Sequence, residues 1–110
     1  MKFMLLLCGD QQTAPDLVDE AMSEDCHRWA EEVNARGALV TQGGLQPAES
    51  ATTVEVRGGE VLLTDGPFAE TKEQIGGYSV IECADIDEAL ELAAKHPWAK
   101  AGKIEVRPVW

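Results

Sequence analysis

Apolar positions follow two different periods along this chain, and each change of period marks an element. Residues 2–8 are apolar at nearly every position, which predicts a strand covered on both faces in the middle of a sheet. From Val18 to Val33 apolar residues recur every three or four positions, which predicts one helix that ends at Gly37. Residues 38–45 predict a second strand, which loosens at its two glycines.

The middle of the chain predicts a hairpin. Residues 52–57 alternate β-branched and charged side chains, the glycine pair at 58–59 is a two-residue turn signal, and residues 60–64 return as the partner strand. The Asp-Gly-Pro sequence at 65–67 breaks that strand. We therefore expect a loop or a single helical turn that runs through Gln74.

The last third predicts a strand at 78–83, a second helix and a final strand at 104–109. Asp85 followed by Glu88 resembles a capping box, and Pro97 stops the helix. The predicted inward positions of this helix are Ile86, Ala89, Leu90 and Ala93. At its end, His96 is expected to be a cation favoured by the helix dipole, and Trp98 a packing residue.

The order of these elements predicts the fold. Strand, helix, several strands, helix and strand is the ferredoxin-like split βαβ plan of the α+β class, with an added hairpin. At 110 residues one domain over 1–110 is expected. Two helices cover only one face of a sheet, which leaves the other face uncovered. A second sheet packed on that face is the simplest way to cover it. We therefore expect a homodimer.

Charge and composition limit the classes of molecule that the protein is expected to bind. The chain has 20 Asp and Glu against 9 Lys and Arg, a net charge of -11, which disfavours nucleic acid. The two predicted helices, within 16–36 and 85–95, carry -8 of that charge, so a small anionic ligand on the sheet side remains allowed. The longest apolar run, Phe3 to Cys8, is too short for a membrane span or a signal peptide. A cytoplasmic protein with reduced cysteines is expected.

Candidate chemistry is densest at residues 65–73. Asp65 is a candidate base at a strand end, and Asp10, at the end of the first strand, is a second candidate acid. The candidate ligand-binding residues are Gly66, Pro67, Phe68, Lys72 and Arg107, of which the two cations would hold an anionic group. Ordinary turn chemistry and a solvated face explain the same cluster. The sequence shows no metal-ligand spacing and no phosphate loop, so no metal or other cofactor is expected.

The run Asp-Gly-Pro-Phe-Ala-Glu-Thr-Lys-Glu at 65–73, followed by Gly76-Gly77-Tyr78, resembles the signature of the DGPF branch of the YCII-related proteins. The first strand, ending Gly9-Asp10, and the closing residues 105–109 are similar to that family as well. The resemblance covers nearly the whole chain. It implies the ferredoxin-like fold and a dimeric α+β barrel.

The resemblance also implies a candidate site. YCII-related proteins are compared with muconolactone isomerase, and a His–Asp dyad has been proposed for them, with its histidine on the first helix. In this chain that position falls on Cys26, and His27 is one residue away. Helical geometry puts His27 roughly 130° from the apolar stripe, so we expect an exposed side chain there, and a small core residue at Cys26.

Two functions remain open. One is a ligand-binding, accessory or regulatory protein, which the resemblance links to extracytoplasmic-function sigma factors. The other is a cofactor-free isomerase or lyase with Asp10, Asp65 or His27 in an acid–base site. The absence of a complete acid–base pair in the sequence favours the binding protein.

Overall fold

The computed structural model describes residues 1–10, 20–66 and 73–110. Its elements, in chain order, are β1 (Lys2–Asp10), α2 (Glu20–Ala35), β2 (Leu39–Gly44), the 3-10 turn η1 (Ala48–Ser50), β3 (Thr52–Arg57), β4 (Glu60–Asp65), β5 (Glu73–Glu82), α3 (Ile86–Lys95), α4 (Trp98–Ala101) and β6 (Lys103–Pro108). None of the helices in the described ranges is long and apolar enough to cross a membrane.

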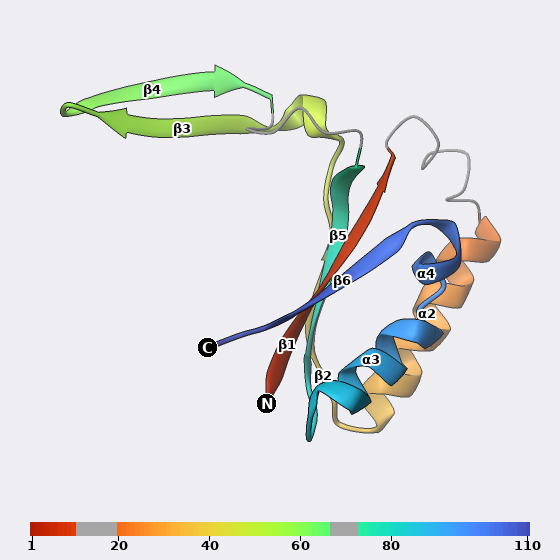
Figure 1. The fold of residues 1–110 in the computed structure, drawn as a ribbon. Helices are drawn as coiled ribbons and strands as arrows, with labels where there is room; N and C mark the ends of the chain where they lie inside the picture. Colours follow the sequence, from red (N-terminus) through yellow and green to blue (C-terminus); the bar gives the residue numbers. More distant parts are fainter. Residues whose placement is uncertain (11–19, 67–72) are drawn as a thin grey trace.

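The main sheet has four antiparallel strands in the order β2-β5-β1-β6. The central place of β1 was predicted, and Pro108 is the last residue of the edge strand β6. Helices α2 and α3 both lie on one face of this sheet (Figure 1). The predicted α+β class is therefore confirmed, with the strand order that the split βαβ plan requires.

The core lies between the sheet and the two helices. Phe3 and Leu5 of β1 are both 0% exposed and point toward the helices, where they meet Val33 of α2 and Leu92 of α3. Burying each such side chain contributes about 1.5–3 kcal/mol. The intervening residues, Met4 and Leu6, are only half-buried and lie on the face away from the helices. The sequence predicted that both faces of β1 are covered. Within the described residues of a single chain, only the face toward the helices is covered.

Strand β5 begins earlier than the sequence suggests. Its first residue is Glu73, and its ladder with β1 pairs Gln74 with Gly9 and Glu73 with Asp10, beyond a bulge between Leu7 and Cys8. The expected loop through Gln74 is therefore wrong at its last two residues. Glycines near this point suggested a break, but pairing with a long neighbouring strand overrides that local signal.

Helix α3 begins as predicted. Asp85 is its N-cap, and its Oδ1 accepts a hydrogen bond from the Glu88 backbone N–H at 2.9 Å. The Glu88 carboxylate in turn accepts from the backbone N–H of Ala84 at 2.9 Å. The first bond satisfies an N–H that the first turn leaves without a helical partner, and the second holds the residue before the N-cap against that turn.

The inward face of α3 differs in part from the prediction. Ala89, Leu92 and Ala93 are buried, whereas Ile86 and Leu90 are 41% and 49% exposed. The expected stripe included the two exposed residues and omitted Leu92. The apolar side chains of this helix span a wider arc than the part that contacts the sheet. Periodicity alone therefore does not determine which residues at the edges of that arc are buried.

The β3–β4 hairpin forms a two-stranded sheet of its own. Its turn glycines, Gly58 and Gly59, have φ of 57° and 83°, the left-handed region that a two-residue hairpin turn requires. The predicted hairpin is confirmed, but it does not join the main sheet. Figure 1 shows it projecting from the body of the chain on the side away from the helices.

Candidate functional site

A groove of about 570 Å³ lies between α2 and the corner where α3 meets α4; we call it the helix groove. Its walls are Met22, Asp25, Arg28, Trp29, Glu32, Lys95, Pro97, Lys100 and Ala101. The α2 residues recur every three or four positions, so they share one side of that helix. On the opposite wall, Pro97 starts the single turn of α4.

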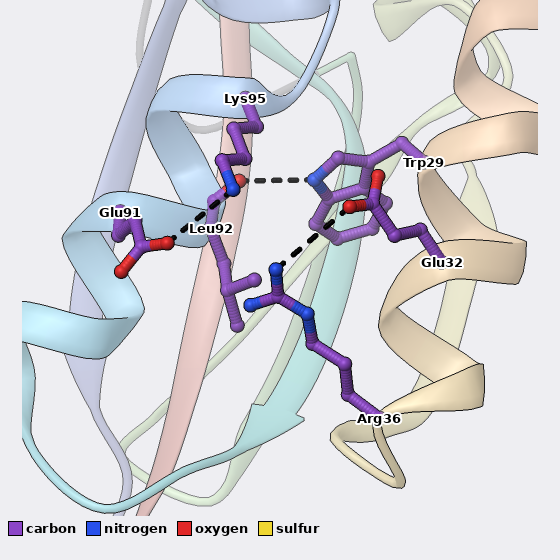
Figure 2. Close-up of polar contacts among 6 residues, drawn as sticks. All are labelled: Trp29, Glu32, Arg36, Glu91, Leu92 and Lys95. Carbon is purple, nitrogen blue, oxygen red and sulfur yellow. Dashed lines mark hydrogen bonds and ion pairs between the residues drawn. The ribbon is translucent and has the colours of Figure 1, made fainter.

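Trp29 forms the buried end of this groove and joins its two walls. The indole is 4% exposed, and its Nε1–H donates a 2.9 Å hydrogen bond to the backbone carbonyl of Leu92 in α3 (Figure 2). The Trp29 ring also meets the His96 ring edge to face, with centroids 4.5 Å apart. The polar tip of Trp29 is therefore satisfied, and the ring is held in one orientation.

His96 is buried directly behind Trp29. Its side chain is 3% exposed, and its Nδ1 accepts a 3.0 Å hydrogen bond from the backbone N–H of Trp98. Burial lowers the pKa of His96 from 6.5 to about 4, so the imidazole is neutral at pH 7 with its proton on Nε2. The sequence-based expectation of a charged helix-end cation is wrong, because the ring turns inward toward Trp29.

Trp98 anchors the corner to the sheet. Its side chain is 9% exposed, as a packing residue should be, and its Nε1–H donates to the carbonyl of Cys8 at 2.8 Å. At Gly102 a Cβ atom would lie 2.5 Å from that carbonyl oxygen and 2.7 Å from the Trp98 Nε1. Only glycine fits this close approach, so the α4–β6 connection is fixed against the end of β1.

Charged side chains surround the opening of the helix groove. Arg28 pairs with Asp25 at 3.3 Å, and Lys95 pairs with Glu91 at 3.3 Å (Figure 2). Lys100 has no ion-pair partner within the described ranges. Three cations and two carboxylates line the groove, a net charge of +1 in a chain of -11. This local excess of positive charge favours a small anion. The cations are exposed and their ion pairs are weak, so they can leave these pairs to bind the anion.

A second groove, of about 460 Å³, lies at the base of the hairpin; we call it the hairpin-base groove. It is lined by Leu45, Gln46, Pro47, Ala48, Ser50, Ala51, Gln74 and Ile75. No side chain in that lining is charged. Part of the sequence-predicted cluster lies next to it, since the Gly66 backbone N–H donates to the Ala51 carbonyl at 2.7 Å and Asp10 pairs with Glu73, the neighbour of Gln74.

The predicted site residues do not form one cluster. Asp65 is exposed at the end of β4, and Gly66 follows it with φ of 99°. Arg107 lies opposite Met4 in the β1–β6 ladder, six residues from Asp10, which is about 20 Å along a strand. The Arg107 guanidinium contacts Glu105 at 2.6 Å. The other predicted ligand-binding residues, Pro67, Phe68 and Lys72, lie outside the described residues.

Comparison with known proteins identifies the family. A model of the YCII-related domain matches residues 1–110. The chain belongs to the YCII-related family. It is 39% identical over 93 residues to an uncharacterised protein of Rhizobium meliloti (strain 1021), covering 83% of this chain and 75% of the relative. The resemblance inferred from residues 65–73 is thus confirmed at the level of the family.

In this YCII-related protein the position expected for a dyad histidine holds Cys26. That side chain is half-buried, and burial, followed by the charge of Asp25, raises the pKa of its thiol. His27 is exposed on α2, as helical geometry predicted, and does not line the helix groove. Cys26 therefore stays a neutral thiol at pH 7. The cysteines at 8, 26 and 83 form no disulfide.

What sequence reasoning missed in this YCII-related protein is the place of His96, which packs on Trp29 and accepts from the backbone N–H of Trp98. His96 was expected to be solvated, yet it is the most deeply buried ionisable side chain of the corner. The available signal was the sequence His-Pro-Trp directly after a helix, where a proline forces the chain to turn. Among the residues that the structure describes, no group of three His, Cys, Asp or Glu side chains is arranged to hold a metal ion.

Proposed function

We propose that this YCII-related protein binds a small anionic molecule in the helix groove and acts as an accessory protein. The observation that carries the proposal is the grouping of Arg28, Lys95 and Lys100 around a rigid aromatic end wall, in a chain whose charge is otherwise strongly negative. Sites for small ligands typically combine an apolar wall with a few convergent polar groups. The groove of about 570 Å³ lies within the usual size range of such sites.

The polar groups of the groove favour binding over catalysis. His96, whose pKa burial lowers to about 4, lies behind Trp29 and uses its Nδ1 to hold the Trp98 backbone N–H. A general base must reach the proton it removes, directly or through one water. His96, which is 3% exposed, therefore has no access to a molecule in the groove, whereas the cations of the lining are exposed.

The alternative is a cofactor-free isomerase or lyase that uses Asp10 or Asp65. Such an enzyme would work at the hairpin-base groove, which Gly66 and the end of β1 adjoin. The described lining there has no cation to hold an anionic substrate. A regulatory role beside an extracytoplasmic-function sigma factor rests on the family resemblance alone.

Calorimetric titration with benzoate and with inorganic phosphate tests the anion site. We expect saturable binding that Lys100→Gln weakens at least about tenfold, the usual loss for a charge-assisted hydrogen bond. Lys2→Gln, the same change on the other side of the sheet, should leave affinity unchanged. Equal affinities in both variants, or turnover of a lactone or enol substrate that Asp65→Asn abolishes, would contradict the proposal.

We further propose that the protein acts as a homodimer through the sheet face that the helices leave uncovered, which we call the open face. Met4, Leu6, Tyr78 and Val80 form its apolar centre, because the ladder pairs Met4 with Val80 and Leu6 with Tyr78. Around them lie Lys2, Glu82, Lys103, Glu105 and Arg107. An apolar sheet face needs a second layer to exclude water, and a two-fold copy supplies one.

Sedimentation equilibrium tests this assembly. Val80→Lys places a charge at the centre of the open face, and we expect it to raise the dimer dissociation constant at least about 100-fold, because the two-fold axis introduces the charge twice. Leu90→Lys is the matched control, since Leu90 is 49% exposed on α3, in the helix layer on the other side of the sheet. Equal dissociation constants for both variants would reject this interface.

A further inference from the structure

The β3–β4 hairpin has one apolar face and one polar face. Cross-strand pairs share a face, and the register pairs Val54 with Leu63 and Val56 with Val61. These four side chains therefore form a continuous apolar strip, and each is between 57% and 67% exposed. On the other face the ladder places Thr53, Glu55, Arg57, Glu60, Leu62 and Thr64.

This strip receives little cover from its own chain. The hairpin is a separate sheet, and the Thr53 hydroxyl closes its base by donating to the carbonyl of Gly66, the residue after β4, at 2.8 Å. From there it projects away from the helices (Figure 1). An isolated two-stranded hairpin is marginally stable in water, and an exposed apolar strip on a protein surface is typical of an interaction site. The alternation of residues along both strands is that of a ribbon packed on one side.

We propose that the apolar strip of the hairpin packs against a second copy of this chain, as an arm that extends the open-face interface. This inference rests on the proposed homodimer. The hairpin projects on the same side of the main sheet as the open face, which is where a partner sheet would lie (Figure 1). In a two-fold dimer the arm of each copy contacts the other copy. The apolar strip and the open face are then buried in one continuous interface.

Charge supports this occupant over others. The hairpin strands carry Glu55, Arg57, Glu60 and Asp65, a net charge of -2. The charged residues of the open face are Lys2, Lys103 and Arg107 against Glu82 and Glu105, a net charge of +1. An arm of net negative charge, with Glu55, Arg57 and Glu60 outside its apolar strip, thus approaches a face of net positive charge in a chain of charge -11. The same acidity disfavours nucleic acid and anionic lipid as occupants.

The area of the interface supports the arm as well. Four strands spaced about 4.8 Å apart and paired over some six residues make a face of only roughly 400 Å² in projection. A stable interface buries about 800 Å² of accessible surface on each partner. The two six-residue strands of the hairpin add about half of the projected area of the sheet face. The arm would therefore enlarge the area available to the interface by about half.

Two adjacent leucines provide the test. Leu63 lies on the apolar strip and Leu62 on the opposite face of the same strand, so Leu63→Lys and Leu62→Lys make the same chemical change one residue apart. By sedimentation equilibrium we expect Leu63→Lys to raise the dimer dissociation constant at least about tenfold, and Leu62→Lys by less than about twofold. Circular dichroism melts of both variants verify that the core remains folded.

Amide hydrogen exchange in the unmodified protein gives a second readout. We expect the β3 and β4 amides to exchange more slowly above the dimer dissociation constant than below it. If the dimer forms but the two leucine variants are indistinguishable and hairpin exchange is independent of concentration, the arm inference is rejected while the open-face dimer stands. If the unmodified protein is monomeric at every concentration, both fall.

Discussion

The sheet under the helices and the hairpin beside it use similar apolar residues in very different surroundings. Phe3 and Leu5 are 0% exposed beneath α2 and α3, whereas Val61 and Leu63 of the hairpin are 64% and 67% exposed. Both segments have the sequence pattern of strands that are packed on at least one side. The difference shows that the described residues cover β1 on one face and the hairpin hardly at all, and this is the basis of our proposal that a second copy covers both.

The largest expected effect sharpens this contrast. Leu5→Ala should lower the free energy of unfolding by about 2–5 kcal/mol, because it leaves a cavity in the core. Leu63→Ala should cost less than about 0.5 kcal/mol in the monomer, where the side chain is already solvated. Urea denaturation at a protein concentration below the dimer dissociation constant measures both. Similar losses for the two variants would contradict the assigned core.

The next effect concerns acid. The unfolded chain protonates His96 near pH 6.5, whereas the folded chain does so near pH 4, so between these values the unfolded state binds more protons. Stability should therefore fall as pH decreases from 6.5 toward 4, by on the order of 2 kcal/mol when partial solvation is discounted. His96→Asn should flatten this pH dependence, measured by urea denaturation. His27→Asn, at the exposed histidine, should not.

A smaller effect concerns the link between α2 and α3. Trp29→Phe removes the Nε1–H donor and leaves the Leu92 carbonyl without that partner, at a cost of about 1–3 kcal/mol. Trp110→Phe is the control, because Trp110 is fully exposed at the C-terminus. Thermal melts compare the two. A loss no larger at Trp29 than at Trp110 would show that the hydrogen bond does not hold the groove wall.

The smallest expected effect lies in the surface ion pairs. Arg28→Gln breaks the contact with Asp25, in which both side chains are more than half exposed, and should change stability by less than about 0.5 kcal/mol. The same substitution should weaken binding of benzoate several-fold if Arg28 serves the helix groove. A change in stability without a change in affinity would assign Arg28 to the fold instead of the site.

Local pattern predicted the elements well, because residues 2–8 and 52–64 carry unambiguous strand periodicity and Asp85 carries a cap signal. The pattern did not predict features that depend on residues far away in the sequence. The start of β5 depends on the length of β1, and the burial of His96 depends on an indole from α2, 67 positions earlier in the numbering. The candidate site shows the same limit. Sequence reasoning singled out carboxylates near residue 65, whereas the helix groove is assembled from cations on three helices.

The most direct test of the account is the mass of the unmodified protein in solution. Small-angle X-ray scattering at high micromolar concentration gives mass and radius of gyration together. We predict twice the chain mass of 11.9 kDa and a radius of gyration above the 15.7 Å of one chain. A mass of 11.9 kDa with a radius near 15.7 Å at that concentration would contradict the claim that a second copy covers the open face and the hairpin.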